Sequence, residues 1–228
     1  MKKRIALCSL VVLGLALAPF PAVAQQMTFR VLPNSRATFK TEALLETVIG
    51  TTAGPAVSGT LTGDPANPQA ATGTIRIDLT TLKTGIEKRD ADMRSKDYFD
   101  TDNEANRYAV FELKGAEIAG TLEPGKEVPA RLTGILTIKQ KPVEIIADAR
   151  ITYLKLTSEQ LESQKRFGFT SDNLRIKAKF NTSFTNHGMQ IPQLLFLKLS
   201  NDIQLETDLT FVRQSPQSQI GQVPRPRV

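Results

Sequence analysis

The residues best suited to chemistry lie between positions 83 and 100, where acidic and basic side chains are interspersed over a short stretch. Arg89, Asp90, Asp92 and Arg94 could form a pair of carboxylates flanked by cations, an arrangement compatible with general acid–base catalysis. Asp90 and Arg94 are also four residues apart, a spacing that stabilises a helix by a few tenths of a kcal/mol. We therefore interpret the cluster as charges that support a helix and anchor it to its neighbours, rather than as a catalytic site.

His187 is the only histidine, and it lies in the turn-forming sequence Thr185-Asn186-His187-Gly188-Met189. We expect it to be a solvated loop residue. A structural zinc site needs about four ligands, and the chain offers one histidine and one cysteine, Cys8, which lies within the first 24 residues. Neither a Gly-x-Ser-x-Gly motif nor a phosphate-binding glycine-rich loop occurs. The sequence therefore predicts no enzyme, no metal site and no required cofactor.

The charged cluster is expected on a short helix over about residues 85–96, at the rim of the fold. Thr84 followed three residues later by Glu87 matches a capping box, in which each side chain bonds a free amide of the first turn. Only two apolar residues occur within the helix, so it can bury a narrow stripe and cannot form a core. Tyr98 and Phe99 follow, and we expect these rings to close over an apolar surface that other segments provide.

The segment from Arg89 to Asp100 carries a longer pattern, R-D-x-x-M-R-S-x-D-Y-F-D. It closely resembles the R-D-x-x-L-R-S-x-D-F-F-D signature of the YceI family of bacterial periplasmic lipid-binding proteins. The resemblance covers most of residues 27–212, with further matching segments at 29–39, 109–111 and 134–143. It implies an antiparallel, lipocalin-like barrel of eight strands around a long apolar ligand, such as a polyisoprenoid or its quinone. Asn34-Ser35, in place of the family's His-Ser pair, and a shortened segment at 139–143 bear on pocket shape and ligand identity more than on the fold.

The first 24 residues are expected to form a secretory signal peptide. Lys2-Lys3-Arg4 precedes an apolar run from Ile5 to Leu17, and Ala22-Val23-Ala24 forms a small-residue cleavage site before Gln25. The apolar run is shorter than the roughly 20 residues that span a bilayer as a helix. We therefore expect an exported, periplasmic protein without stable membrane insertion.

The mature chain is expected to hold one lipid-binding domain, residues 25–213, and a disordered tail over 214–228 that is rich in Gln and Pro. The formal charge of the whole chain is +6, and it falls to +3 without the three basic residues of the leader. Lysines and arginines are spread singly along the chain, so we expect no nucleic-acid partner. A homodimer is compatible with the sequence.

Alternating apolar and polar residues predict an all-β fold whose strands each have one wet face. The expected strands cover residues 27–40 with a kink at Pro33, 57–62, 74–79, 109–114, 131–138, 143–153, 174–184 and 202–211. Residues 41–49 fit helical turns or a strand, 63–68 have the composition of a loop, and Thr157 with Gln160 predicts a small surface helix. Eight such strands must close into a barrel or pack as two sheets. With the family resemblance, we expect an eight-stranded antiparallel lipocalin-like barrel.

A barrel of eight strands can be filled by its own side chains or can hold one small ligand. Small inward-facing residues would leave room, namely Gly59, Ala109, Ala147, Ala149 and Ala178. We expect a carrier of an apolar isoprenoid lipid or quinone; the alternative is a stress-related structural periplasmic protein with a filled barrel. Each inward phenylalanine fits either the core or a pocket wall. The candidate ligand-binding residues are Phe29, Phe39, Leu61, Ile77, Leu79, Phe99, Phe111, Leu113, Leu136, Ile138, Ile145, Ala147, Phe180, Phe184, Leu205 and Phe211.

Overall fold

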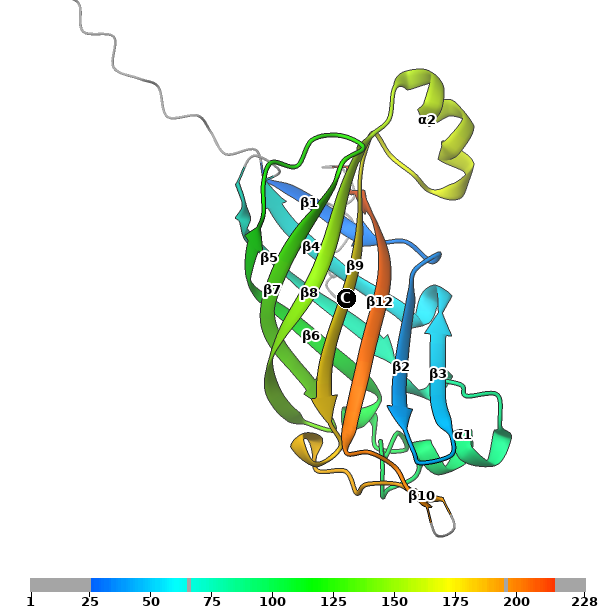
Figure 1. Cartoon of the computed structure of the whole chain (residues 1–228). Coiled ribbons are helices and arrows are strands. Elements are labelled where there is room, and N and C mark those ends of the chain that lie inside the picture. Colours follow the sequence, from blue (N-terminus) through cyan, green and yellow to red (C-terminus); the bar gives the residue numbers. More distant parts are fainter. Residues whose placement is uncertain (1–25, 65–66, 195–196, 216–228) are drawn as a thin grey trace, which may run out of the picture.

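In the computed structural model, which describes residues 26–64, 67–194 and 197–215, long strands alternate with tight turns (Figure 1). The predicted signal peptide and residues 216–228 of the predicted tail lie outside the described residues. The strands are β1 (Met27–Val31), β2 (Arg36–Glu42), β3 (Thr47–Ala53), β4 (Val57–Asp64), β5 (Asn67–Asp78), β6 (Tyr108–Ile118), β7 (Glu127–Ile138), β8 (Lys141–Lys155), β9 (Asp172–Ser183), β10 (Gln193–Leu194), β11 (Leu197–Lys198) and β12 (Asp202–Arg213). The α-helices are α1 (Glu87–Arg94) and α2 (Ser158–Gln164).

Eight of these strands form a closed antiparallel ring, which confirms the predicted barrel. Their order is β1-β4-β5-β6-β7-β8-β9-β12, and pairing of β1 with β12 closes the ring. The alternating pattern places one face of each strand inside, as on β9 and β12, where Phe180 lies opposite Leu205 and Ile176 lies opposite Leu209. The exposed face of β9 carries Lys177 and Lys179, as its sequence pattern predicted.

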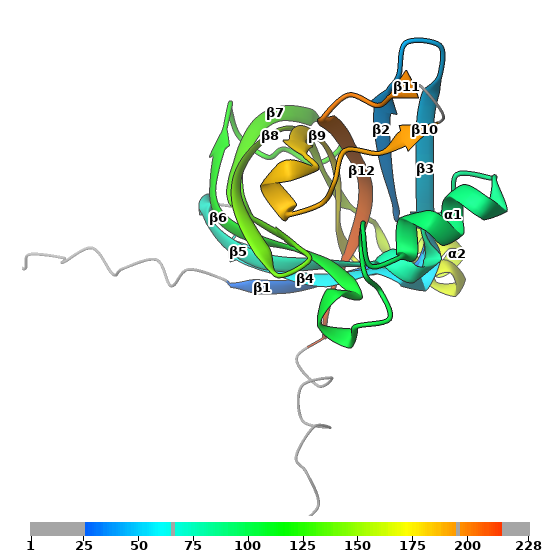
Figure 2. The same ribbon diagram turned by 90° about the horizontal axis from the view of Figure 1, so that it is seen from below.

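The segment predicted as one kinked strand over residues 27–40 is two strands, because the chain leaves the ladder in the turn at Pro33. β1 pairs with the end of β12, whereas β2 pairs with its first half and carries β3 on the other edge. In the described residues no ladder joins β3 to β5; an isolated bridge between Thr51 and Lys83 holds that edge. The barrel wall is therefore split at one end, and α1 lies beside the split (Figure 2).

The structure decides between the two alternatives for one segment and differs from the prediction for another. Residues 41–49 are the end of β2, a turn and the start of β3, and the turn is held by a 2.7 Å hydrogen bond from Ala43 N to Glu46 O. The loop predicted over residues 63–68 is largely strand, since β4 continues to Asp64 and pairs there with Asn67 of β5. Residues 41–49 therefore take the strand alternative, and at 63–68 cross-strand pairing outweighs the turn preference of the residues.

The helix predicted over residues 85–96 is shorter, Glu87–Arg94, and its predicted capping box is absent. Ile86 occupies the N-cap position without a side-chain hydrogen bond. Thr84 instead donates its hydroxyl and its backbone N–H to Oδ1 of Asp90, at 2.6 and 2.7 Å. The capping box predicted after β8 is present: Thr157 Oγ1 accepts from Gln160 N, and α2 projects from the end of the barrel opposite α1 (Figure 1).

The interior holds two apolar clusters, one towards each end of the barrel. Ile77 and Phe180 pack against both. The closed-end cluster contains Phe29, Val31, Val57, Ile151, Tyr153, Leu174, Leu209 and Phe211, among others. The open-end cluster lies towards α1 and contains Phe39, Val48, Leu79, Leu82, Ala109, Leu136, Ile138, Ile145, Phe184, Met189 and Ile203.

A buried polar network stabilises the closed end. The Tyr153 hydroxyl donates to Asp172 Oδ1 at 2.6 Å, and Arg213 and Ser171 donate to Asp172 Oδ2 at 3.1 and 2.8 Å. Burial and the hydrogen bond to the Asp172 carboxylate raise the pKa of Tyr153 to about 12. These bonds tie the end of β8 to the start of β9 and the end of β12.

Candidate functional site

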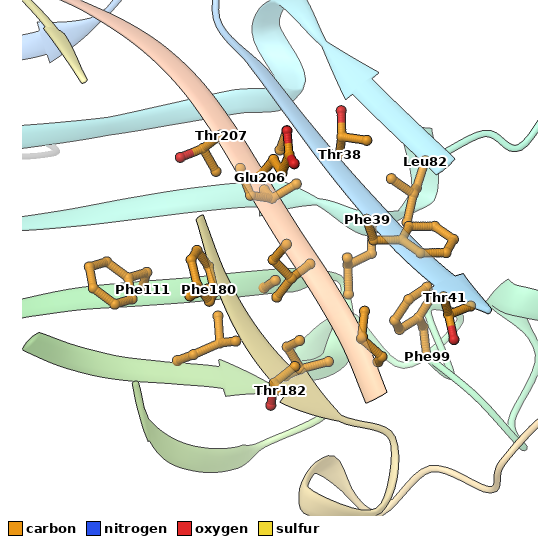
Figure 3. A pocket seen from close by; sticks show the side chains of 18 of the residues that line it. Thr38, Phe39, Thr41, Leu82, Phe99, Phe111, Phe180, Thr182, Glu206 and Thr207 are labelled. Carbon is orange, nitrogen blue, oxygen red and sulfur yellow. The ribbon is translucent and has the colours of Figure 1, made fainter. Parts of the chain in front are cut away.

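A cavity of about 540 Å³ occupies the barrel interior and reaches the split between α1 and β3. Its lining includes every second residue of β9 from Ile176 to Thr182, together with Phe184, and every second residue of β12 from Ile203 to Phe211. Eight residues of strand cover roughly 26 Å. The cavity is therefore long, runs along the strands, and is walled mainly by apolar side chains (Figure 3).

The cavity persists because small residues stand opposite large ones. Ala147 and Ala178 lie in the wall where a larger side chain would fill the lumen. Phe111 folds against Gly134 of the neighbouring strand, where an added Cβ would collide with its ring, and Phe39 folds against Gly50 in the same way. Each glycine lets a ring lie flat against the wall, which leaves the centre of the barrel open.

Fourteen of the sixteen candidate ligand-binding residues line this cavity. Phe111 and Phe180 lie side by side there, with ring centroids 6.2 Å apart (Figure 3). Phe29 and Ile145 do not line it; they are 2% and 5% exposed and belong to the closed-end and open-end clusters. The fourteen are Phe39, Leu61, Ile77, Leu79, Phe99, Phe111, Leu113, Leu136, Ile138, Ala147, Phe180, Phe184, Leu205 and Phe211. Contact of any of these residues with a ligand stays a prediction.

The mouth of the cavity contains polar residues that were not among the candidates. Glu46 comes from the turn between β2 and β3, Lys88, Arg89 and Asp92 come from α1, and Tyr98 follows α1. The signal that could have found them is the position of the charged helix next to Tyr98 and Phe99 at the barrel rim. Sequence alone could not place Glu46 there, because the pairing of β2 with β12 brings it to the mouth.

The contacts of Arg89 and Asp90 agree with the expected anchoring role. Arg89 donates through Nη1 to Glu46 Oε1 and through Nε to Thr84 Oγ1, the latter at 2.9 Å. Burial alone would raise the pKa of Asp90, but the two hydrogen bonds from Thr84 outweigh it, so that pKa lies below its ordinary value. The charges therefore attach α1 to the β2–β3 turn on one side and to residue 84 on the other.

The expectation of a solvated His187 was wrong. Its side chain is fully buried in the turn after β9, with Nε2 2.8 Å from Thr182 Oγ1 and Nδ1 3.2 Å from the Lys141 carbonyl oxygen. Because a carbonyl can only accept, Nδ1 carries the proton and Nε2 accepts from the threonine. Burial lowers the pKa of His187 below its ordinary value, which keeps the ring neutral. Its role is to tie the turn to β8 and β9 under the open-end cluster.

Within residues 26–64, 67–194 and 197–215, no group of three or more His, Cys, Asp and Glu side chains is placed to hold a metal ion. In the same part of the chain, no helix combines the length and the hydropathy that a bilayer span requires.

Solved structures with this fold come from several bacteria. A polyisoprenoid-binding domain from Saccharophagus degradans, implicated in plant cell wall breakdown, superposes with a TM-score of 0.61 and 13% identity, over 82% of this chain and 99% of that chain. BcnA from Burkholderia cenocepacia gives 0.57 and 16%, over 77% and 95%. The Campylobacter jejuni YceI protein gives 0.56 and 17%, over 76% and 89%. At these identities the likeness establishes the fold.

The sequence itself identifies the family. No curated protein matches the chain. The family model described as a YceI-like domain matches residues 30–211, from near the end of β1 almost to the end of β12 and therefore around most of the barrel. The chain belongs to the YceI-like domain family.

Proposed function

We propose that this protein is a periplasmic carrier that binds a long apolar isoprenoid lipid, of the polyprenyl or isoprenoid quinone type, inside its barrel. The observation that carries the proposal is the apolar lumen of about 540 Å³, which falls within the range of roughly 300–1,000 Å³ for ligand pockets. The family and the polyisoprenoid-binding domain from Saccharophagus degradans support it. Non-covalent binding uses no chemical step, in keeping with the anchoring contacts of Arg89 and Asp90.

The driving force of such binding is removal of the lipid chain from water. Each buried CH₂ group contributes roughly 0.8 kcal/mol, before the cost of ordering the chain is subtracted. A lumen of this length accepts an extended chain without strand separation, because the side chains of its wall leave the centre of the barrel open. A carrier of this kind shields the chain from water.

The alternative is a structural protein whose barrel is filled by its own side chains. In a filled barrel, mid-strand inward residues are buried. Here Ile75 and Ile77 on β5 and Phe111 and Leu113 on β6 face inwards and yet keep part of their surface accessible. This observation favours the carrier.

The test is mass spectrometry of an organic extract of the purified full chain, with a matched pair of variants. Leu205→Trp adds volume inside the cavity, whereas Gln204→Trp makes the same change at the exposed neighbour on β12. We expect a stoichiometric apolar lipid from the wild type and from Gln204→Trp, and much less from Leu205→Trp. Repeated extractions without lipid, from protein that also binds no added prenyl compound, would favour the structural alternative.

Since the natural chain contains no tryptophan, each variant also gains a unique fluorophore. Titration of delipidated Leu205→Trp with an isoprenoid quinone should quench its emission, because the indole borders the lumen. The indole of Gln204→Trp points to solvent and should respond weakly. Equal responses would indicate binding outside the barrel.

A further inference from the structure

The charged side chains that line the cavity are all paired within the protein. Arg89 pairs with Glu46, and Lys88 Nζ lies 3.3 Å from Asp92 Oδ2. Glu206, the remaining charged residue of the lining, pairs with Lys179 at 2.8 Å. The end of a ligand that lies in the mouth would therefore meet two cations and two anions that are already paired with each other.

An anionic head group would be disfavoured in this setting. To pair with Arg89 it would have to displace Glu46, whose side chain is only about one-third exposed, and would leave that carboxylate unpaired beside a second negative charge. Lys88 is well exposed, but its partner Asp92 lines the same mouth. A phosphate or diphosphate would gain little here and would meet two carboxylates.

Tyr98 is a different kind of group in the same mouth. It lines the cavity, and its hydroxyl has no hydrogen-bond partner within the described residues. Its backbone is fixed by a 3.1 Å bond from its N–H to Ser95 O, and the N–H of Phe99 donates to Met93 O at 3.0 Å. The ring is thus held in place by the chain that follows α1. Burial, together with the charges of Asp97 and Asp92, raises the pKa of Tyr98, so its hydroxyl stays protonated and able to donate.

We propose that the mouth selects an apolar chain that ends in an uncharged, hydrogen-bonding head group, such as an alcohol or a quinone carbonyl, with Tyr98 as its donor. The Arg89–Glu46 and Lys88–Asp92 pairs disfavour an anionic head group, because each cation of the mouth already has a carboxylate partner. This inference rests on the proposed function, because it concerns the head group of the ligand in the same cavity. It narrows the ligand from isoprenoid lipids in general to those without a phosphate.

The test compares three ligands with one prenyl chain: the alcohol, its monophosphate and the parent hydrocarbon. Each displaces a fluorescent apolar probe from delipidated full-length protein, below the concentration at which the ligand forms micelles. We expect the alcohol to bind at least about tenfold more tightly than the monophosphate. In Tyr98→Phe the alcohol should lose roughly threefold to tenfold, while the hydrocarbon keeps its affinity. Glu46→Gln should strengthen binding of the monophosphate relative to the hydrocarbon.

The outcomes separate the two proposals. If all three ligands bind but the monophosphate equals or exceeds the alcohol, or if Tyr98→Phe weakens the alcohol and the hydrocarbon alike, the head-group inference is wrong and the carrier function stands. If none of the three binds to wild-type protein of native fold, the carrier function is wrong as well. The hydrocarbon is the matched control, because it has the same chain but no group that can form a hydrogen bond.

Discussion

Replacement of Phe180 by alanine distinguishes a hollow barrel from a filled one. Phe180 lies in the middle of β9, packs against both apolar clusters and borders the cavity beside Phe111. In a solid core, Phe→Ala costs about 3–5 kcal/mol because a sealed cavity is left behind. Beside an existing cavity no new sealed space forms, so only the transfer free energy of the partly buried ring and its contact with Phe111 are lost. We expect a loss of about 2 kcal/mol.

Phe29→Ala is the matched control, because the chemical change is the same but Phe29 is 2% exposed and does not line the cavity. It should cost about 3–5 kcal/mol. The assay is urea unfolding of delipidated protein, with extraction of bound lipid from the same variants before delipidation. Phe180→Ala should change the amount or chain length of the lipid, and Phe29→Ala should not. Equal losses of stability for both variants, with no lipid in the wild type, would refute the hollow barrel.

Three further predictions concern the polar and glycine contacts. The unfolding free energy should fall as pH drops below about 6.5, because His187 gains a proton in the unfolded chain but stays neutral in the folded one. In His187→Gln this pH dependence should vanish between pH 5.5 and 7.5. An unchanged slope would show that another group titrates. Gly134→Ala should cost about 1–3 kcal/mol in denaturant unfolding, because the added Cβ would collide with the Phe111 ring and the Glu112 carbonyl oxygen. Gly115→Ala is the control and should be nearly neutral, because no atom lies within 4 Å of the added Cβ. Asp90→Ala should cost about 1–3 kcal/mol, because it removes the carboxylate oxygen that accepts both hydrogen bonds from Thr84. A wild-type melting temperature would contradict the anchoring role.

Strand alternation predicted most of the barrel because each strand has one dry and one wet face. The inward set on β9 and the capping box at Thr157 were both readable locally and both occur in the structure. His187 was misjudged because its neighbours do form a turn, and only the distant Lys141 carbonyl and the packing around the turn bury the ring. Thr84 was assigned to a helix cap because sequence spacing cannot show that its hydroxyl donates to the Asp90 carboxylate instead.

The candidate site was likewise predictable from the sequence only in part. Inward apolar residues follow from the period of two, so most of the predicted lining residues face the lumen. The same period does not tell a cavity wall from a filled layer, which is why Phe29 and Ile145 entered the prediction although both are packed in clusters. The polar mouth depends on β2 pairing with β12 at a separation of more than 160 residues, which no local pattern encodes.

The break at Pro33 explains why this barrel has a mouth at all. β1 and β2 both pair with β12, but β1 also pairs with β4 and so closes the ring, whereas β2 pairs with β3, which no ladder joins to β5 in the described residues. Between β1 and β2 the chain turns through Ser35, which is fully buried. Its hydroxyl accepts from Thr210 N at 3.0 Å, and its carbonyl accepts from Gly54 N. These hydrogen bonds fix β1 in the closed barrel, while β2, which also pairs with β12, carries β3 along its outer edge. The closed end is then made by apolar packing and the Tyr153–Asp172–Arg213 network, and the open end is set by the Arg89–Glu46 pair and the Thr51–Lys83 bridge. Lumen volume and mouth chemistry therefore depend on different residues, so chain binding and head-group choice can be altered separately.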